Sequence, residues 1–138
     1  MDIPIELANL SVERGTILFT KFENIDHPKF FVIIGVNKNL IAGFFYVNSE
    51  INRNVNRKPE QLKMQYEISC DDYKFLEYDS YICATEIQFI NKNLLSEGIK
   101  SGNVKIKDTL KPEHLSELLE LARNSKLFSP VEKKEFLY

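Results

Sequence analysis

The segment His27-Pro28-Lys29 places an imidazole and an ammonium group at one polar corner of the chain. Histidine is the side chain whose ordinary pKa suits proton transfer near neutral pH, and a lysine can stabilise a phosphate oxyanion. If the apolar segments 29–36 and 40–48 pair as a hairpin, this corner lies near Ser49. A base, a cation and a hydroxyl at one edge could serve phosphoryl transfer to an internal 2′-hydroxyl. The simpler alternative is a solvated turn and an ordinary strand-end serine.

A second candidate feature is the polar, asparagine-rich loop over residues 49–63, whose cations are candidate RNA-binding residues: Arg53, Arg57, Lys58 and Lys63. Single-stranded RNA needs such cations, and its bases can stack on aromatic rings such as those of Tyr46 or Tyr66. A charge run of this kind is also typical of a solvated loop. The carboxylates of Asp79 and Glu86 have no recognised acid–base spacing, and for them we favour a structural role in turns.

The length of 138 residues predicts a single domain over residues 1–138. We expect a lead-in at 1–13 and a tail at 129–138 that is loose or used in an interface. Hydrophobic residues make up 43% and charged residues 28%, as in ordinary globular proteins. Because the formal net charge is −2, any nucleic-acid surface would have to be a local patch.

Metal, cofactor and membrane signatures are missing from the sequence. Cys70 and Cys83 lack metal-ligand spacing and the chain has two histidines, so we expect no metal site. We also expect no cofactor, because the sequence has no glycine-rich phosphate-binding loop. There is no apolar run of about 18 residues and no basic-then-apolar start. We therefore expect no membrane association and a cytoplasmic location with reduced thiols.

These candidate residues must be positioned by a sheet of short strands. Strands are predicted at 14–22, 29–36, 40–48, 64–69, 78–85 and 103–107, whereas 87–95 fits a strand or a helical turn equally well. Residues 30–34 are apolar without alternation, which is typical of a central strand buried on both faces. Leucines at helical spacing after Pro112 predict one helix to about Leu127. The order predicts a small, strongly bent antiparallel sheet with a C-terminal helix laid on it.

The order of these motifs resembles the PemK/MazF-type toxins, the mRNA interferase family of toxin–antitoxin systems. The resemblance covers residues 14–128 and rests on five loose motifs in sequence. They are Arg14-Gly15-Thr16-Ile17, His27-Pro28 with the apolar strand behind it, the strand ending at Ser49, Asp79-Ser80 with its apolar strand, and the Gly102 turn followed by a leucine-rich helix.

The resemblance implies an SH3-like antiparallel barrel with a C-terminal helix, working as a homodimer with an antitoxin protein as partner. It implies cleavage of single-stranded RNA without metal, with Ser49 in one catalytic position and His27 where the family has an arginine. Arg14, in the first motif, would join the RNA-binding residues. Arginine stays charged and can bind a phosphorane bidentately, which histidine cannot do. Either His27 takes over as acid and base with Lys29 supplying charge, or the chain is an inactive module that binds a protein partner or nucleic acid.

Overall fold

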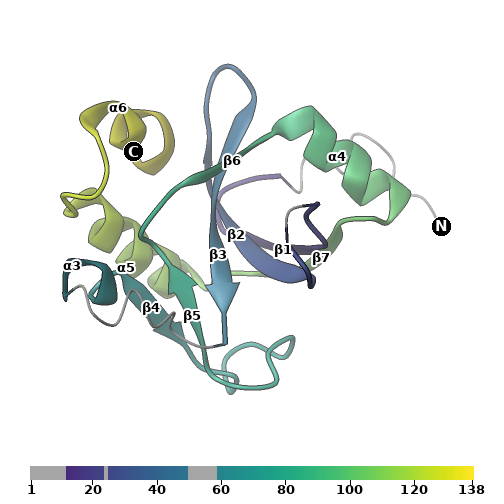
Figure 1. Ribbon diagram of the computed structural model, residues 1–138, viewed down its shortest axis with the longest axis horizontal. Helices are drawn as coiled ribbons and strands as arrows, with labels where there is room; N and C mark the ends of the chain where they lie inside the picture. Colours follow the sequence, from purple (N-terminus) through teal and green to yellow (C-terminus); the bar gives the residue numbers. More distant parts are fainter. Residues whose placement is uncertain (1–11, 24, 50–58) are drawn as a thin grey trace.

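The computed structural model describes residues 12–23, 25–49 and 59–138, and Figure 1 traces the chain through them. Its strands are β1 (Thr16–Thr20), β2 (Lys29–Val36), β3 (Ile41–Asn48), β4 (Gln65–Ile68), β5 (Ser80–Cys83), β6 (Gln88–Asn91) and β7 (Lys105–Thr109). Its helices are α3 (Pro59–Leu62), α4 (Lys92–Ser101), α5 (Pro112–Arg123) and α6 (Pro130–Glu132), which runs into the π-helical turn η1 (Lys133–Leu137). The predicted mainly β fold with a C-terminal helix is confirmed.

All pairings in the sheet are antiparallel, in the order β4-β5-β3-β2-β1-β7, and β6 pairs with the first half of β3. Within the described residues, β4 and β7 form the two ends of this path. The long strands β2 and β3 lie at its centre, and the other strands pair on either side of them. Figure 1 shows the sheet strongly bent around them, as the sequence predicts.

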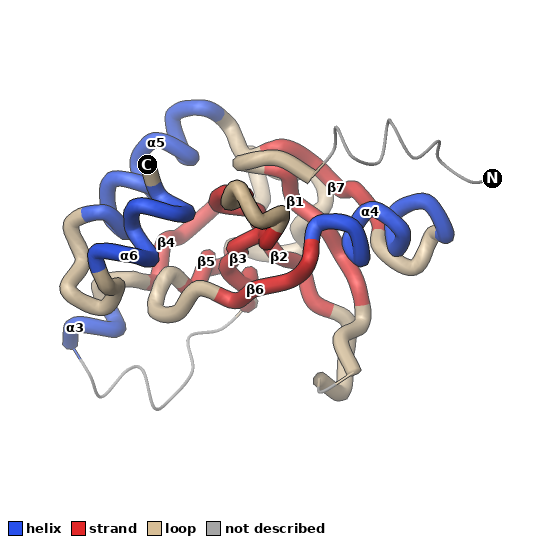
Figure 2. Tube along the Cα trace, turned by 90° about the horizontal axis from the view of Figure 1, so that it is seen from above, coloured by secondary structure: helices blue, strands red, loops and turns tan. Residues whose placement is uncertain are grey.

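Strand β2 is buried on both faces, as its unbroken apolar run predicts. Val32 and Ile34 pack in one core with β3, α5 and the C-terminal residues, whereas Phe31 and Ile33 pack in a second core with α4. These four side chains are fully buried. The sheet is therefore a middle layer, and Figure 2 shows it between α4 on one side and α5 with α6 on the other.

Helix α4 covers the second face of the sheet and is the element that the sequence analysis left undecided. Residues 87–95 supply both alternatives, because β6 ends at Asn91 and the helix starts directly after it. The Asn91 side chain caps the helix by accepting from the backbone N–H groups of Asn93 and Leu94. Gly102 ends it in the left-handed conformation, at φ 89°. Its apolar side chains Leu95 and Ile99 are fully buried.

The C-terminal segment is packed into the protein, so the expectation of a loose tail is wrong, whereas its use in an interface stays a prediction. Phe136 and Leu137 are buried in the larger core. The backbone of Phe136 lies directly against Gly35 of β2, and its ring lies against Gly43 of β3, which pairs with Gly35. The absence of side chains at both glycines creates the space into which this segment fits.

Strand β7 differs in part from its prediction. Alternation in the predicted strand at 103–107 favours an inward position for both Val104 and Ile106, yet Val104 is buried and Ile106 is 41% exposed. The strand starts at Lys105 and, within residues 12–23, 25–49 and 59–138, pairs only with β1 at the edge of the sheet. The pairing also shifts register between Ile17 and Leu18, which changes the face that each β7 side chain meets. In the described part of the chain, no helix is long and apolar enough to cross a membrane.

Candidate active site

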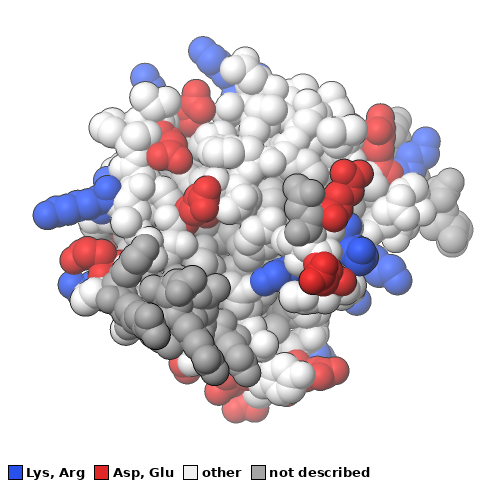
Figure 3. Space-filling model, viewed as in Figure 1, with Lys and Arg blue, Asp and Glu red and all other residues white. Residues whose placement is uncertain are grey.

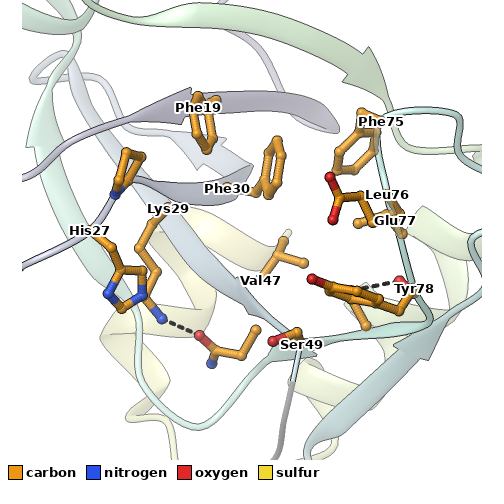
Figure 4. Close-up of a pocket in the computed structure, with 13 residues that line it drawn as sticks. Phe19, His27, Lys29, Phe30, Val47, Ser49, Phe75, Leu76, Glu77 and Tyr78 are labelled. Atoms are coloured by element: carbon orange, nitrogen blue, oxygen red, sulfur yellow. Dashed lines mark hydrogen bonds between the residues drawn. The ribbon is translucent and has the colours of Figure 1, made fainter.

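The register of β2 against β3 brings the polar ends of the two strands together. Phe30 near the start of β2 pairs with Val47 near the end of β3. His27, Lys29 and Ser49 consequently line one open pocket of about 850 Å³ (Figure 4). The structure thus brings the three candidate catalytic residues to one cavity, while their chemical roles stay predictions.

Lys29 supplies a positive charge to this pocket, and its ammonium group can still donate hydrogen bonds to a ligand. Nζ donates a hydrogen bond to Oδ1 of Asn48 and lies 5.4 Å from the ring centroid of Tyr46. Burial of the stem lowers the pKa of Lys29 below its ordinary value, and the negative potential of Cys83 opposes that shift. A less hydrated ammonium attracts an anion more strongly than a fully solvated one. Lys29 therefore suits a phosphate ligand.

His27 and Ser49 are both exposed and accessible from solvent. Figure 4 shows the His27 imidazole beside Lys29 at one end of the pocket, with Ser49 on the wall that β3 provides. His27 comes from the polar loop before β2, where Pro28 restricts the backbone of the residue that precedes it. An accessible imidazole can exchange protons with a bound substrate and with water.

The opposite wall comes from the loop between β4 and β5, which the sequence analysis treated only as a turn. Its pocket-lining residues are Phe75, Leu76, Glu77 and Tyr78. Leu76 is buried and anchors the loop, whereas Tyr78 is 60% exposed. Ser80 donates from Oγ to the carbonyl oxygen of Tyr78, at 3.0 Å, and so fixes the end of this loop.

Asp79 has the structural role that the sequence analysis favoured. Its Oδ1 accepts a hydrogen bond of 2.9 Å from the backbone N–H of Cys70, which ties the two ends of the β4–β5 loop together. Hydrogen bonds from Cys70 lower the pKa of the Asp79 carboxyl. The aromatic residues that precede the Asp79-Ser80 pair were the available signal for this wall, because binding residues are disproportionately found on loops held by a rigid scaffold.

Three phenylalanine rings cover the side of the pocket between the two walls. The ring centroids of Phe19 and Phe30 are 4.5 Å apart, and those of Phe30 and Phe75 are 4.9 Å apart. All three side chains are half-buried, so each ring packs on the core and still presents an edge or face to the cavity. Such a surface can hold a flat apolar group.

Two of the proposed RNA-binding cations, Arg14 and Lys63, lie in the described residues and do not line this pocket. The Arg14 guanidinium donates to the carbonyl oxygens of Ile34, Phe136 and Tyr138, at 2.7, 3.0 and 3.2 Å, and Arg14 does not line the pocket. Lys63 is exposed and lies 3.8 Å from Glu60, beside α3. Arg53, Arg57 and Lys58 lie outside the described residues.

One face of the molecule carries charges of both signs. On the face drawn in Figure 3, the basic and acidic side chains of the described residues are interspersed. Among residues 12–23, 25–49 and 59–138 there is also no group of three or more His, Cys, Asp or Glu side chains arranged to hold a metal ion. The polar side chains that line the pocket include His27, Lys29 and Ser49, with Glu77 opposite them.

The sequence matches no protein-family model and no curated protein. The resemblance of its motif order to PemK/MazF-type toxins therefore stays a prediction, and function must be inferred from the pocket.

Proposed function

We propose that this protein is an endoribonuclease that cleaves single-stranded RNA without metal in the pocket between β2, β3 and the β4–β5 loop. One observation carries the proposal: His27, Lys29 and Ser49 line the same open cavity. A proton-transfer group, a cation and a hydrogen-bond donor can together promote phosphodiester transesterification. The resemblance in motif order favours RNA as the phosphodiester.

In the proposed reaction, the ribose 2′-oxygen attacks the neighbouring phosphorus and neutral His27 takes the 2′-hydroxyl proton. The bond between phosphorus and the 5′-oxygen breaks, and the 5′-oxygen leaves with a proton from water. The second product carries a 2′,3′-cyclic phosphate, and His27 returns its proton to solvent. Lys29 offsets the charge that develops on the non-bridging oxygens, and Ser49 donates a hydrogen bond to one of them.

Wider features of the proposal rest on the resemblance alone. They are a toxin role, a cytoplasmic location, a homodimeric state and an antitoxin protein as partner. The SH3-like character of the barrel belongs with them, beyond the mainly β fold described above.

Purified protein and single-stranded RNA in the presence of a chelator provide the test. We expect cleavage to cyclic-phosphate ends, and we expect His27→Ala to slow it about 10²- to 10⁴-fold, the usual contribution of a general acid–base group. The matched control is His114→Asn. His114 lies on α5, does not line the pocket, and pairs through Nδ1 with the Tyr73 hydroxyl at 2.6 Å, an interaction that an asparagine oxygen can replace.

If wild-type protein cleaves no faster than the His27→Ala/Ser49→Ala double variant, the proposal is wrong. The chain would then be the inactive binding module that the missing family arginine suggests.

A further inference from the structure

The pocket has two chemically different ends. At one end are the imidazole of His27 and the ammonium of Lys29, and at the other are Phe75, Glu77 and Tyr78 (Figure 4). Among the described lining residues, Glu77 supplies the one carboxylate. A nucleotide has the same polarity, because its phosphate is anionic and its base is flat and largely uncharged. The two ends therefore match the two parts of one nucleotide.

The end formed by the β4–β5 loop has the shape of a base-binding site. In Figure 4, the Tyr78 ring lies across the pocket from Phe30, and the Glu77 carboxylate points into the space between Phe75 and Tyr78. Tyr78 is 60% exposed, so its ring is accessible to a ligand in the pocket. A base that stacks on Tyr78 would turn one edge toward Glu77.

The acceptor pattern of Glu77 selects among the four bases. An ionised carboxylate has two acceptor oxygens and no donor. Guanine presents two adjacent donors, N1–H and the 2-amino group, on its Watson–Crick edge. Adenine and cytosine place an acceptor nitrogen beside their amino group, and uracil has one N–H between two carbonyl oxygens. Guanine is thus the base that can bind the carboxylate through two parallel hydrogen bonds.

We propose that the β4–β5 loop forms a guanine-binding subsite, with Glu77 accepting from the Watson–Crick edge and Tyr78 stacking on the base. This inference rests on the proposed function, since it names the nucleotide that the same pocket holds. It assigns Glu77 to recognition of the substrate and leaves proton transfer to His27.

The test measures binding without cleavage, so that its outcome is independent of nuclease activity. The probes are short, fluorescently labelled, fully 2′-O-methylated oligouridines with one central guanine, hypoxanthine or adenine, because 2′-O-methylation removes the attacking hydroxyl. Loss of one hydrogen bond to a charged acceptor corresponds to about a tenfold change in Kd. We expect the guanine probe to bind about tenfold more tightly than the hypoxanthine probe, which lacks the 2-amino group, and still more tightly than the adenine probe.

Two variants and a control assign the residues. Glu77→Gln should reduce the guanine preference to about threefold or less, because the amide replaces one acceptor with a donor. Tyr78→Ala should weaken all probes about tenfold and keep the preference, since stacking does not depend on the base. Glu97→Gln, at an exposed position of α4 outside the pocket, should change neither quantity.

Equal affinity of wild-type protein for the guanine and adenine probes would overturn the inference, and this measurement needs no variant. So would an unchanged preference in Glu77→Gln, or a Glu77→Gln variant that cleaves every RNA more slowly while it still prefers guanine. A guanine preference in a protein that cleaves no RNA would leave the subsite standing and refute the nuclease proposal alone.

Discussion

The two ends of strand β2 each hold a cation, and the two cations have opposite surroundings. Near the last residues of the strand, Arg14 donates three hydrogen bonds to backbone carbonyl oxygens and joins the start of the sheet to the C-terminus. At the first residue, Lys29 donates a hydrogen bond to Asn48, its one side-chain partner among the described residues, and lines an open pocket. We call the first region, formed by Arg14, Gly35, Gly43 and residues 136–138, the C-terminal clamp.

We assign the cation near the end of β2 to stability and the cation at the start of β2 to function. The clamp directs its positive charge to protein atoms, with Arg123 adding a hydrogen bond to the carbonyl oxygen of Leu137. The pocket leaves part of its charge available for a ligand, and burial lowers the pKa of Lys29, so holding that charge opposes folding. Substitutions in the clamp should therefore reduce stability, whereas substitutions in the pocket should reduce activity and leave the fold intact.

The largest expected effect on stability comes from Gly35→Ala. The added Cβ would overlap the carbonyl oxygen of Phe136, which belongs to the backbone and cannot turn away. We expect a loss of about 3 kcal/mol or more in the free energy of unfolding, measured by urea denaturation. The control is Gly102→Ala, where the Cβ meets no atom within 4 Å and only the left-handed backbone is strained. That strain costs about 1 kcal/mol, so a larger loss at Gly102 than at Gly35 would refute the clamp.

Arg14→Lys should have an intermediate effect. A lysine keeps the charge but cannot reach several carbonyl oxygens with a planar fork, so we expect a loss of about 1.5–3 kcal/mol by the same measurement. Lys63→Met is the matched control, because the exposed Lys63–Glu60 pair should contribute less than about 1 kcal/mol. If Arg14→Lys left stability unchanged and weakened RNA binding instead, Arg14 would belong with the RNA-binding residues after all.

Lys29→Met should change stability least. The variant keeps most of the apolar stem and removes a charge whose burial is unfavourable, so we expect stability within about 1 kcal/mol of wild type and a large loss of cleavage.

The lowered pKa of Lys29 also predicts that stability depends on pH. Between that pKa and the ordinary value of 10.5, the unfolded chain binds more protons than the folded chain, so stability should rise with pH.

In Lys29→Met this alkaline rise should be absent. Solvent screening at the half-buried site keeps it small, so it should be measured as the difference between wild type and variant across a pH series. A rise of equal size in both proteins would show that another group is responsible.

The fold was predictable from local patterns and the clamp was not. The unbroken apolar run of β2 predicts a strand buried on both faces, and the bounds of β2 agree with the prediction to the residue. Helix α4 also had sequence signals. Asn91 and Gly102 are residue types that commonly cap helices, and Leu95 and Ile99, which lie between them, are buried. Arg14, by contrast, binds a partner 122 residues away in sequence. No local period encodes such a contact, and the resemblance alone placed Arg14 among the predicted RNA-binding residues.

One part of the candidate site was likewise predictable from local sequence patterns, and another part was not. Hairpin geometry alone predicted that His27, Lys29 and Ser49 would meet, since antiparallel strands joined by a short turn align the start of one with the end of the other. The wall formed by Glu77 and Tyr78 follows from β5 pairing with β3, a contact between strands that are separated in sequence by residues 49–64 and by β4. Strand order is set by packing across the whole sheet, which explains why the pocket's second wall was missed.

The most direct test of the central claim is a backbone amide NMR titration of the whole chain with a 2′-O-methylated single-stranded oligonucleotide. If the pocket is the functional site, the largest shift changes will fall on residues 27–30, 47–49 and 75–78, and the amides of 34–36 and 136–138 in the clamp will stay in place. Changes centred on Arg14 and the C-terminal residues, with the pocket unaffected, would contradict the assignment of function to the start of β2.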